Sequence, residues 1–467
     1  MRQIWLGFQA LNSVLLLAVL LGTSDGAQRN VLLLISDNQD FGDVGFNGHP
    51  VIQTPHLDRL AKESVRFSHA FATTASCGAS RAVLYTGLFT HGNGQYGHSH
   101  SFHNQSLRQN VTTVFGMLRE AGYATALIGK DHVVTRDDSR LHAEFRKDSK
   151  RDQVQMAKDA AEFLRDTGDK PFLLAVGFHD PHPTSRAGWG LSDEQRLPTT
   201  PVYDPKQAVI PYYLHDRPEV REGLAGYYQQ ISQLDTGVGM MLDVLKQSGK
   251  AEDTLIMFFS DHGSSEPGAM GNLYEPGVHI PFLVSRPDLQ SPGMTNSAMI
   301  TLCDVTPTIL DWTGVKPPYP LHGRSFLPIL EQQKPEGWDD VLLDHVMHEV
   351  TQYYPMRAIR DRQYKLIWNI AWRLEYPLPI DTMRRKTWTE TLRRGEKKIG
   401  PRTVENFLFR DEIELYDLEA DPAEVNNLAA DPAHQAVKLK MLARLRDRLT
   451  ETADPWLDRH PVPGLND

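Results

Sequence analysis

Runs of apolar residues that end in polar side chains recur along the first part of the chain. Four of these runs span residues 30–36, 124–129, 172–178 and 254–259. Continuous apolar runs of this length are typical of strands that are buried on both faces of a parallel sheet. Because segments with helical spacing separate the runs, the pattern predicts a doubly wound α/β fold with right-handed crossovers.

Helices are predicted between these strands by apolar spacing and by residues typical of helix ends. The helix at 54–61 has Thr54 as its N-cap and Pro55 at its first position. The remaining elements of this part are expected as helices at 114–121, 151–166, 224–245 and 304–310 and as a strand at 280–284.

The character of the chain changes beyond about residue 340. Strands are predicted at 364–369 and 413–418, with a long irregular stretch between them, and an amphipathic helix is predicted at 432–451. A chain of this length is expected to form more than one structural unit. We expect a signal peptide at 1–27, a large α/β domain at 28–340, and a C-terminal α+β subdomain at 341–467 with a small antiparallel sheet and a terminal helix.

The N-terminus has the pattern of a signal peptide. Arg2 precedes an apolar run at 14–21, and a small-residue segment at 22–27 follows it. The run is too short to span a membrane, and no later stretch is long enough. We therefore expect cleavage after Ala27, no membrane anchor, and an exported protein that is periplasmic or secreted, or lysosomal if the source is an animal.

Composition and charge narrow the class of protein. The 467 residues are 40% hydrophobic and 23% charged, as in a globular protein. With only Cys77 and Cys303, no disulfide framework is expected, and Cys303 is expected to be a buried thiol. The formal net charge of −10 argues against nucleic acid as the main partner.

One segment has the opposite charge balance. Residues 356–410 contain 14 Lys and Arg against 6 Asp and Glu, a formal net charge of +8. Such a segment is either a solvated basic face or a rim that attracts a polyanion.

Polar residues follow each of the four predicted strands. They are Asp37 and Asn38 after the first, Lys130 and His132 after the second, His179 and His182 after the third, and Asp261 and His262 after the fourth. A single cluster of this kind is explained by a turn or a helix cap. Four together indicate a site, because open α/β sheets bind ligands at the carboxyl ends of their strands.

Oxygen ligands from two of these strand ends indicate a metal site. Asp37, Asn38 and Asp261 offer carboxylate and amide oxygens, which suit Ca²⁺ or Mg²⁺. Zinc is not expected, since the sequence shows neither a thiolate cluster nor paired histidines with the usual spacing.

The segment Cys77-Gly78-Ala79-Ser80-Arg81 stands out among the remaining motifs. Small residues at 72–76 allow a tight turn before it, and a short helix is predicted from Arg81 to Gly87, with an N-terminus that favours an anion. A buried structural cysteine is the ordinary interpretation of Cys77.

This pentapeptide resembles the signature of the sulfatase family, Cys-x-Pro-x-Arg, with Ala79 in place of the proline. The resemblance implies an alkaline-phosphatase-like fold, with a large, mostly parallel mixed sheet between helices and a smaller C-terminal α+β subdomain. It also implies that a formylglycine-generating or radical maturase enzyme oxidises Cys77 to formylglycine. The hydrated aldehyde would attack the sulfur of the substrate, which splits one hard step into two.

The resemblance assigns further roles by position. A calcium ion is implied at Asp37, Asn38, Cys77, Asp261 and His262. Arg81, Lys130 and His132 are implied to hold the formylglycine and the sulfate, with His132 assisting sulfate release, and His179 to protonate the leaving group. Two positions depart from the family pattern: Asn38 replaces the usual aspartate, and Met270 stands where the family has a basic residue.

Within the family, the chain is similar to the heparan N-sulfatases over nearly its whole mature length. The similar stretches lie at 178–182, 272–277, 306–312 and 348–357. They imply that a sulfated glycosaminoglycan oligosaccharide is the partner, with His348, Glu349, Arg357 and His182 contacting it. His348 and Glu349 are otherwise explained as a structural pair.

The expected activity is therefore removal of N-linked sulfate from a terminal glucosamine. An O-sulfatase acting on a related sugar, such as a glucosamine 6-sulfatase, is the nearest alternative. An inactive relative that only binds sulfated glycan is another, motivated by Asn38, Ala79 and Met270. A metal-dependent phosphodiesterase is disfavoured, since those relatives usually carry Ser or Thr as the nucleophile. A homodimer is compatible with the sequence.

Overall fold

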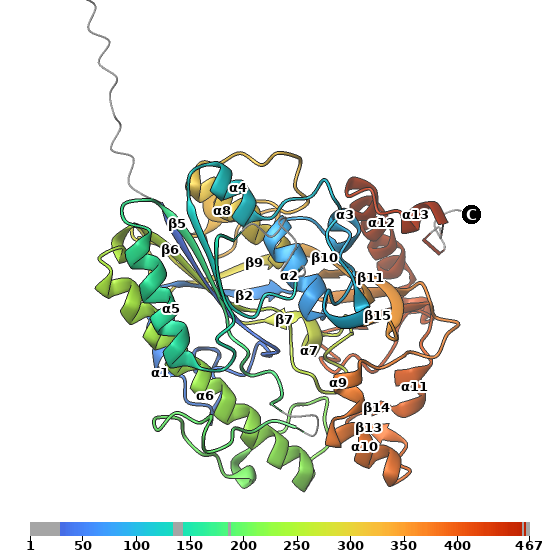
Figure 1. The fold of residues 1–467 in the computed structure, drawn as a ribbon. Coiled ribbons are helices and arrows are strands. Elements are labelled where there is room, and N and C mark those ends of the chain that lie inside the picture. Colours follow the sequence, from blue (N-terminus) through green and yellow to red (C-terminus); the bar gives the residue numbers. More distant parts are fainter. Residues whose placement is uncertain (1–28, 134–142, 185–187, 460–461, 464–467) are drawn as a thin grey trace, which may run out of the picture.

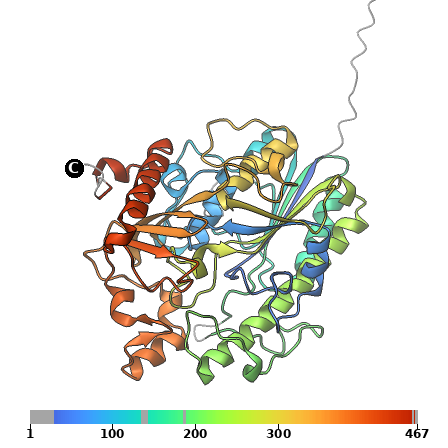
Figure 2. The ribbon, with the colours of Figure 1, turned by 180° about the vertical axis from the view of Figure 1, so that it is seen from behind.

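The computed structural model describes residues 29–133, 143–184, 188–459 and 462–463. The signal peptide expected at 1–27 lies outside them. A nine-stranded mixed sheet with helices on both faces forms the larger part, and a four-stranded antiparallel sheet lies beside it (Figure 1). The view from behind shows the same arrangement, with the C-terminal helices packed on the outer side of the smaller sheet (Figure 2). This architecture is the fold class that the sequence predicts.

The large sheet is built from strands in the first 301 residues. They are β1 Asn30–Ser36, β2 Val65–Phe71, β3 Ala124–Gly129, β4 Phe145–Lys147, β5 Phe172–Gly177, β6 Thr254–Ser260, β7 His279–Ile280, β8 Phe282–Ser285 and β9 Thr295–Thr301. Their order is β4-β3-β5-β1-β6-β8-β2-β7, and β9 pairs with β2. The five strands from β4 to β6 are parallel, and β8 is antiparallel to β6.

Helices cover both faces of this sheet because its central strands are apolar on both sides. The helices are α1 Pro55–Lys62, α2 Cys77–Thr86, α3 Thr90–Asn93, α4 Val114–Glu120, α5 Gln153–Asp166, α6 Pro218–Gln247, α7 Glu275–Val278 and α8 Val305–Thr313. In β1, Leu33 packs in the core shared with α2, α4 and α8, whereas Leu32 and Leu34 pack in the core shared with α1, α5 and α6. This alternation follows from the two-residue period of a strand.

The predictions for this part need two corrections. The strand expected at 280–284 is interrupted at Pro281, which separates β7 from β8, because proline cannot donate a ladder hydrogen bond. The strands β2 and β9 were not predicted, since polar residues break their apolar pattern. The strands expected at 30–36 and 124–129 are confirmed at those bounds.

The C-terminal part contains a second sheet of order β10-β11-β12-β15, antiparallel throughout. Its elements are β10 Asp340–Met347, β11 Tyr353–Asp361, β12 Tyr364–Asn369, α9 Ile380–Met383, α10 Lys386–Arg393, β13 Lys398–Ile399, β14 Arg402–Thr403, α11 Val404–Leu408, β15 Ile413–Asp417, α12 Gln435–Glu451 and α13 Trp456–Arg459. β12 and α12 match the expected strand and terminal helix, whereas β10 and β11 were not predicted. The division expected between residues 340 and 341 stays a prediction.

Hydrophobic packing joins the terminal helix to the small sheet. Leu442 and Leu445 of α12 share one buried cluster with Leu366 and Trp368 of β12. None of the helices in the described ranges has the length and apolar composition needed to cross a membrane.

Candidate active site

The carboxyl ends of four central strands meet at one edge of the large sheet. β3, β5, β1 and β6 are adjacent and in register, with Gly129 opposite Gly177 and Ser36 opposite Ser260. Every strand-end residue that the sequence singles out follows one of these strands. The structure therefore brings together segments that lie more than 200 residues apart.

The helix α2 points its N-terminus at this edge and places Cys77 in its first turn. It begins four residues before the Arg81 start that the sequence predicts, and all its residues are buried. Ser76 is the N-cap in extended conformation. Since the first backbone N–H groups of a helix have no partner within it, this end favours an anion.

Cys77 faces a compact group of polar atoms. Its Sγ lies 3.1 Å from His262 Nε2 and 3.8 Å from both Asp37 Oδ1 and Asn38 Oδ1. Ligand atoms of Asp37, Cys77, Asp261 and His262 all lie within 4.8 Å of one another, and all four residues are buried. Burial raises the pKa of the Cys77 thiol well above its usual value.

Two buried cations are paired with the carboxylates of this group. Lys130 Nζ contacts Asp37 Oδ2, and Arg81 Nε donates to Asp261 Oδ2 at 2.9 Å. Burial alone would raise the pKa of Asp37, but the charge of Lys130 overcomes it and holds that pKa below its usual value. Arg81 Nη2 is buried without a hydrogen-bond partner among the described residues.

The residues Asp37, Asn38, Asp261 and His262 fit a hard divalent cation. Asn38 has a φ of +67°, a left-handed conformation that asparagine tolerates, and its backbone N–H lies 3.2 Å from Asp261 Oδ1. Two carboxylates and one amide oxygen thus converge in a buried place, and Asn38 Nδ2 has no partner among the described residues. This donor set is the one that calcium prefers.

Histidines border this group on the side of β3 and β5. His132 has a φ of +53°, and its carbonyl accepts hydrogen bonds from Gln95 Nε2 at 3.0 Å and Ser99 Oγ at 3.1 Å. His179 Nδ1 lies 3.1 Å from the carbonyl of Lys150, so that its Nδ1–H donates there and Nε2 carries the lone pair. Burial lowers the pKa of His179 to about 4.

The small sheet contributes His348 and Glu349 at the end of β10. His348 Nδ1 lies 3.1 Å from the hydroxyl of Ser76, the residue before Cys77. Glu349 Oε1 accepts the N–H of Ile380 at 2.7 Å, which fixes the start of α9. Asp381 of α9 in turn lies 3.7 Å from His182 Nε2.

The structure does not bring Arg357 to this group. Arg357 is fully buried, and its Nε donates to Asp454 Oδ2 at 2.6 Å. Its Nη2 donates to Asp454 Oδ1 at 3.4 Å, and its Nη1 donates to the carbonyls of His345 and Met356. Met270 stands at the position where the family pattern has a basic residue. Its side chain is completely buried, so this position supplies no cation.

Sequence reasoning missed several residues of this region. Asp381 lies in the basic stretch between predicted strands, where no periodicity marks it. His98 and His100 lie in a loop, and the structure places both beside His132. Their His-x-His spacing was the one signal that could have indicated them.

A sulfatase family model matches residues 29–315, and a model described as N-sulphoglucosamine sulphohydrolase, C-terminal, matches residues 270–378. The chain is 35% identical to N-sulphoglucosamine sulphohydrolase of Homo sapiens, with 94% of each chain covered. It is 24% identical to an N-acetylglucosamine-6-O-sulfatase of Bacteroides thetaiotaomicron, covering 92% of this chain and 87% of that protein.

Solved structures share the fold. One, in complex with its substrate D-glucosamine-2-N,6-O-disulfate, superposes with a TM-score of 0.67 at 20% identity, covering 91% of this chain and 98% of the other. A phosphonate monoester hydrolase of Agrobacterium radiobacter superposes with a TM-score of 0.66 at 20% identity, covering 91% and 96%. Proteins with this fold thus hydrolyse different classes of substrate, and the fold alone does not identify the reaction. The residues of the site have to be compared instead.

Proposed function

The chain belongs to the sulfatase family, and we propose that it removes the N-linked sulfate from N-sulfoglucosamine at the non-reducing end of heparin or heparan sulfate fragments. The observation that carries this proposal concerns the C-terminal part. The N-sulphoglucosamine sulphohydrolase C-terminal model spans the segment that supplies His348 and Glu349. His348 contacts Ser76 directly before the expected nucleophile at position 77.

The proposed reaction requires two groups that the unmodified polypeptide does not contain. Formylglycine made from Cys77 supplies an aldehyde hydrate as nucleophile, and a calcium ion supplies positive charge against the sulfate oxygens. Asp37, Asn38, Asp261 and His262 are the residues that would hold the ion.

The chain's own cations prepare the site for an anion. Lys130 is a point charge on one side of the carboxylate group, and Arg81 is oriented by Asp261 on the other. Both side chains are buried, so their fields act in a medium of low polarity where electrostatic stabilisation is strong. The N-terminus of α2 adds backbone donors directed at the same point.

We propose that two histidines move protons. His179 Nε2 remains for the nitrogen that leaves from sulfur, because Nδ1 is fixed by Lys150. We assign to His179 the proton for that nitrogen, and to His132 the removal of a proton when sulfate is released. His182, whose Nε2 lies 3.7 Å from Asp381, is proposed to contact the substrate.

The small sheet is proposed to recognise the sugar. His348 contacts the loop before α2 and Glu349 contacts the start of α9, so each fixes a neighbouring segment. The Glu349 carboxylate can bind a ring hydroxyl or the freed amine there, whereas both nitrogens of His348 are engaged by Ser76 and His98, so His348 acts by positioning this segment. Since Arg357 is buried and paired, we do not retain it as a contact of the substrate.

Maturation must precede folding in this proposal. Cys77 is 1% exposed, so a second enzyme cannot reach it in the folded chain. The proposed partner is therefore a maturase that acts on the unfolded segment, and we propose export through the N-terminal signal peptide.

The test uses two matched heparin oligosaccharides. One carries N-sulfated glucosamine at its non-reducing end, and the other carries 6-O-sulfated N-acetylglucosamine there. The protein is produced in a host for which mass spectrometry shows formylglycine at position 77, and free sulfate is measured. Release only from the first substrate supports the proposal, whereas release only from the second identifies an O-sulfatase. If neither substrate releases sulfate when the aldehyde is present and Ca²⁺ is supplied, the result favours an inactive relative that only binds sulfated glycan.

A further inference from the structure

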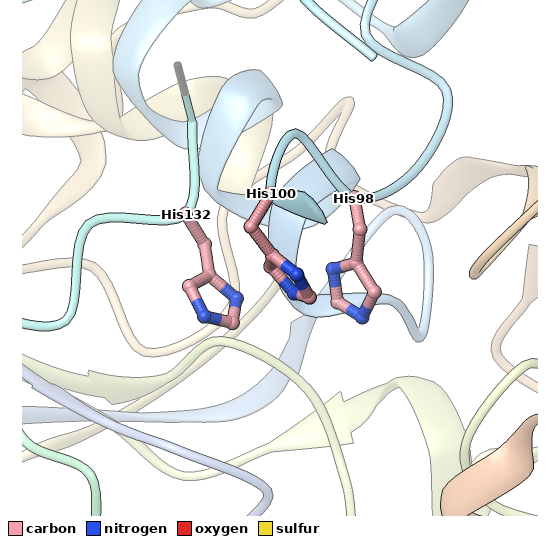
Figure 3. A group of neighbouring side chains, drawn as sticks. All are labelled: His98, His100 and His132. Carbon is pink, nitrogen blue, oxygen red and sulfur yellow. The ribbon is translucent and has the colours of Figure 1, made fainter. Parts of the chain in front are cut away.

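Three imidazoles gather at the border of the active site in an arrangement that calcium chemistry does not use. They belong to His98 and His100 in the loop after α3 and to His132 after β3. One nitrogen from each ring lies within 4.8 Å of a nitrogen from each of the others. Figure 3 shows His100 between the other two rings, each of which turns a nitrogen toward it.

The nitrogens that face this space have no other partner. His98 Nδ1 and His132 Nδ1 are buried and make no hydrogen bond with any described residue. His98 is 5% exposed, so its free nitrogen is also shielded from water. A buried polar atom left without a partner is costly, and a ligand at this point would satisfy both nitrogens.

Two successive hydrogen bonds fix the orientation of the His98 ring. His98 Nε2 lies 3.0 Å from His348 Nε2, and His348 Nδ1 lies 3.1 Å from Ser76 Oγ. When His348 donates to Ser76 through Nδ1, it accepts from His98 Nε2–H. That tautomer leaves a lone pair on His98 Nδ1, the nitrogen that faces the group. Metal-binding histidines are typically oriented in this way by a second hydrogen bond.

Charges of both signs act on the three rings, and Arg81 adds a second cation near His132. Lys130 acts on all three rings and would oppose a cation, but it is paired with Asp37. Asp131 and Asp381 act on His100 with the opposite sign. Burial lowers the pKa of each ring, which keeps the lone pairs that a metal needs.

We propose that His98, His100 and His132 bind a divalent transition-metal ion, with Zn²⁺ the best match, and that this ion inhibits the enzyme. Three imidazoles with an open fourth position form a common zinc-binding set. Zinc–nitrogen bonds of about 2.0–2.1 Å in a tetrahedron put neighbouring nitrogens roughly 3.3 Å apart, so the rings would have to bring their nitrogens, which now lie within 4.8 Å, closer together on binding. His100 is exposed and gives the ion a path from solvent.

This site differs in chemistry from the group around Cys77. The latter offers carboxylate and amide oxygens, which suit a hard cation, whereas three nitrogens favour zinc, cobalt, nickel or copper. Inhibition follows because a metal-bound His132 cannot take up a proton. The inhibitory role of the ion rests on the proposed function, whereas metal binding by the three histidines does not.

The binding test uses Co²⁺ as a spectroscopic probe on the full mature chain. Calcium is kept at saturation so that the oxygen site is occupied, and Co²⁺ is titrated while the visible absorbance is recorded. We expect one equivalent with the intense bands of tetrahedral coordination, no thiolate charge-transfer band, and displacement by Zn²⁺. His100→Gln should weaken binding by at least about 10-fold, the lower end of the effect of disturbing a metal site.

A neighbouring histidine provides the matched control. His103 lies in the same loop but outside the group, so His103→Gln should keep the cobalt spectrum and the affinity. The proposal is overturned if His100→Gln binds Co²⁺ as the wild type does, or if Asp261→Asn rather than His100→Gln removes the spectrum. It is equally overturned if no Co²⁺ binds.

Activity provides the second readout. Zn²⁺ should inhibit sulfate release by the wild type, and His100→Gln should need at least about 10-fold more Zn²⁺ for the same inhibition. Equal sensitivity of the two proteins would refute the inhibitory role. Should the enzyme show no sulfatase activity at all, the cobalt spectrum still decides whether the metal site exists, so the two proposals fail separately.

Discussion

Replacing Lys130 by methionine tests whether a cation belongs beside Asp37. Lys130 Nζ contacts Asp37 Oδ2, and neither side chain is more than 2% exposed. The variant leaves the Asp37 carboxylate buried without its cation. Breaking a buried pair in this way costs about 3–5 kcal/mol. With an unfolding entropy of about 2.1 cal/mol/K per residue, that loss lowers the Tm by roughly 3–5 °C for a chain of this length.

Calcium should reverse much of this loss. The ion would supply the positive charge that Lys130→Met removes, so it should bind the variant more tightly than the wild type. At 100 times its Kd a ligand stabilises the folded state by about 2.7 kcal/mol. Thermal unfolding, followed by circular dichroism with Ca²⁺ and with EDTA, measures the gain. We expect a larger calcium-dependent rise in Tm for Lys130→Met than for the wild type.

Lys365 is a matched control in the small sheet. It is also fully buried, and its Nζ lies 2.7 Å from Glu424 Oε1 and 2.8 Å from Glu275 Oε1. No oxygen cluster suited to calcium is found there among the described residues. Lys365→Met should therefore be destabilised, with a calcium response no larger than that of the wild type. Equal responses of the two lysine variants would refute a calcium ion at Asp37.

The dependence on pH gives an independent check. In the wild type the pKa of Asp37 is lower in the folded chain than in the unfolded chain. This difference stabilises the fold at pH values above the unfolded-state pKa, and the stabilisation is lost as the pH falls toward the folded-state pKa. Without Lys130, burial should raise that pKa instead. The calcium-free variant should then lose stability relative to the wild type as the pH rises from about 4. A difference in Tm that does not change with pH would contradict this account.

Three further changes have distinct expected outcomes. Cys77→Ala should abolish sulfate release while circular dichroism shows an intact fold, and appreciable residual turnover would contradict the nucleophile assignment. His179→Ala should reduce kcat by about 10²–10⁴-fold on N-sulfoglucosamine but much less on an aryl sulfate with a good leaving group; equal losses on both would exclude it as the acid. Arg357→Ala should lower stability by about 3–5 kcal/mol because Asp454 is left buried and unpaired, and an effect confined to KM would instead indicate a substrate contact.

The polar ends of the central strands could be predicted because they depend on local sequence and one general rule. Each apolar run ends at a polar residue such as Asp37 or Asp261, and parallel strands align these ends at one edge. The start of α2 could not be predicted in the same way. Four small residues before Arg81 carry no helical signal, and only the packing of α2 against the sheet makes Cys77 its first residue.

The histidine group was beyond sequence reasoning for a different reason. The predictions excluded zinc because no paired-histidine spacing of the usual kind is present. His98 and His100 are two residues apart in a loop, and His132 follows a strand that is distant in sequence. Only tertiary structure joins them, through the positive φ of His132 and the hydrogen bonds to its carbonyl. For Arg357 the error was the opposite one. The resemblance suggested a contact with the substrate, but the structure shows Arg357 in a buried ion pair with Asp454.

The small sheet also holds the segment that carries Cys77, the proposed nucleophile. Four consecutive residues before Cys77 each bond to another segment: Thr73 O accepts from Asp344 N, Thr74 Oγ1 lies near His345 Nδ1, Ala75 O accepts from Gly271 N, and Ser76 Oγ lies near His348 Nδ1. Three of those four partners follow residue 339. A chain cut after β9 would therefore lose the groups that fix the backbone at Cys77. The position of Cys77 and the proposed recognition of the sugar thus depend on the same strand end, at β10.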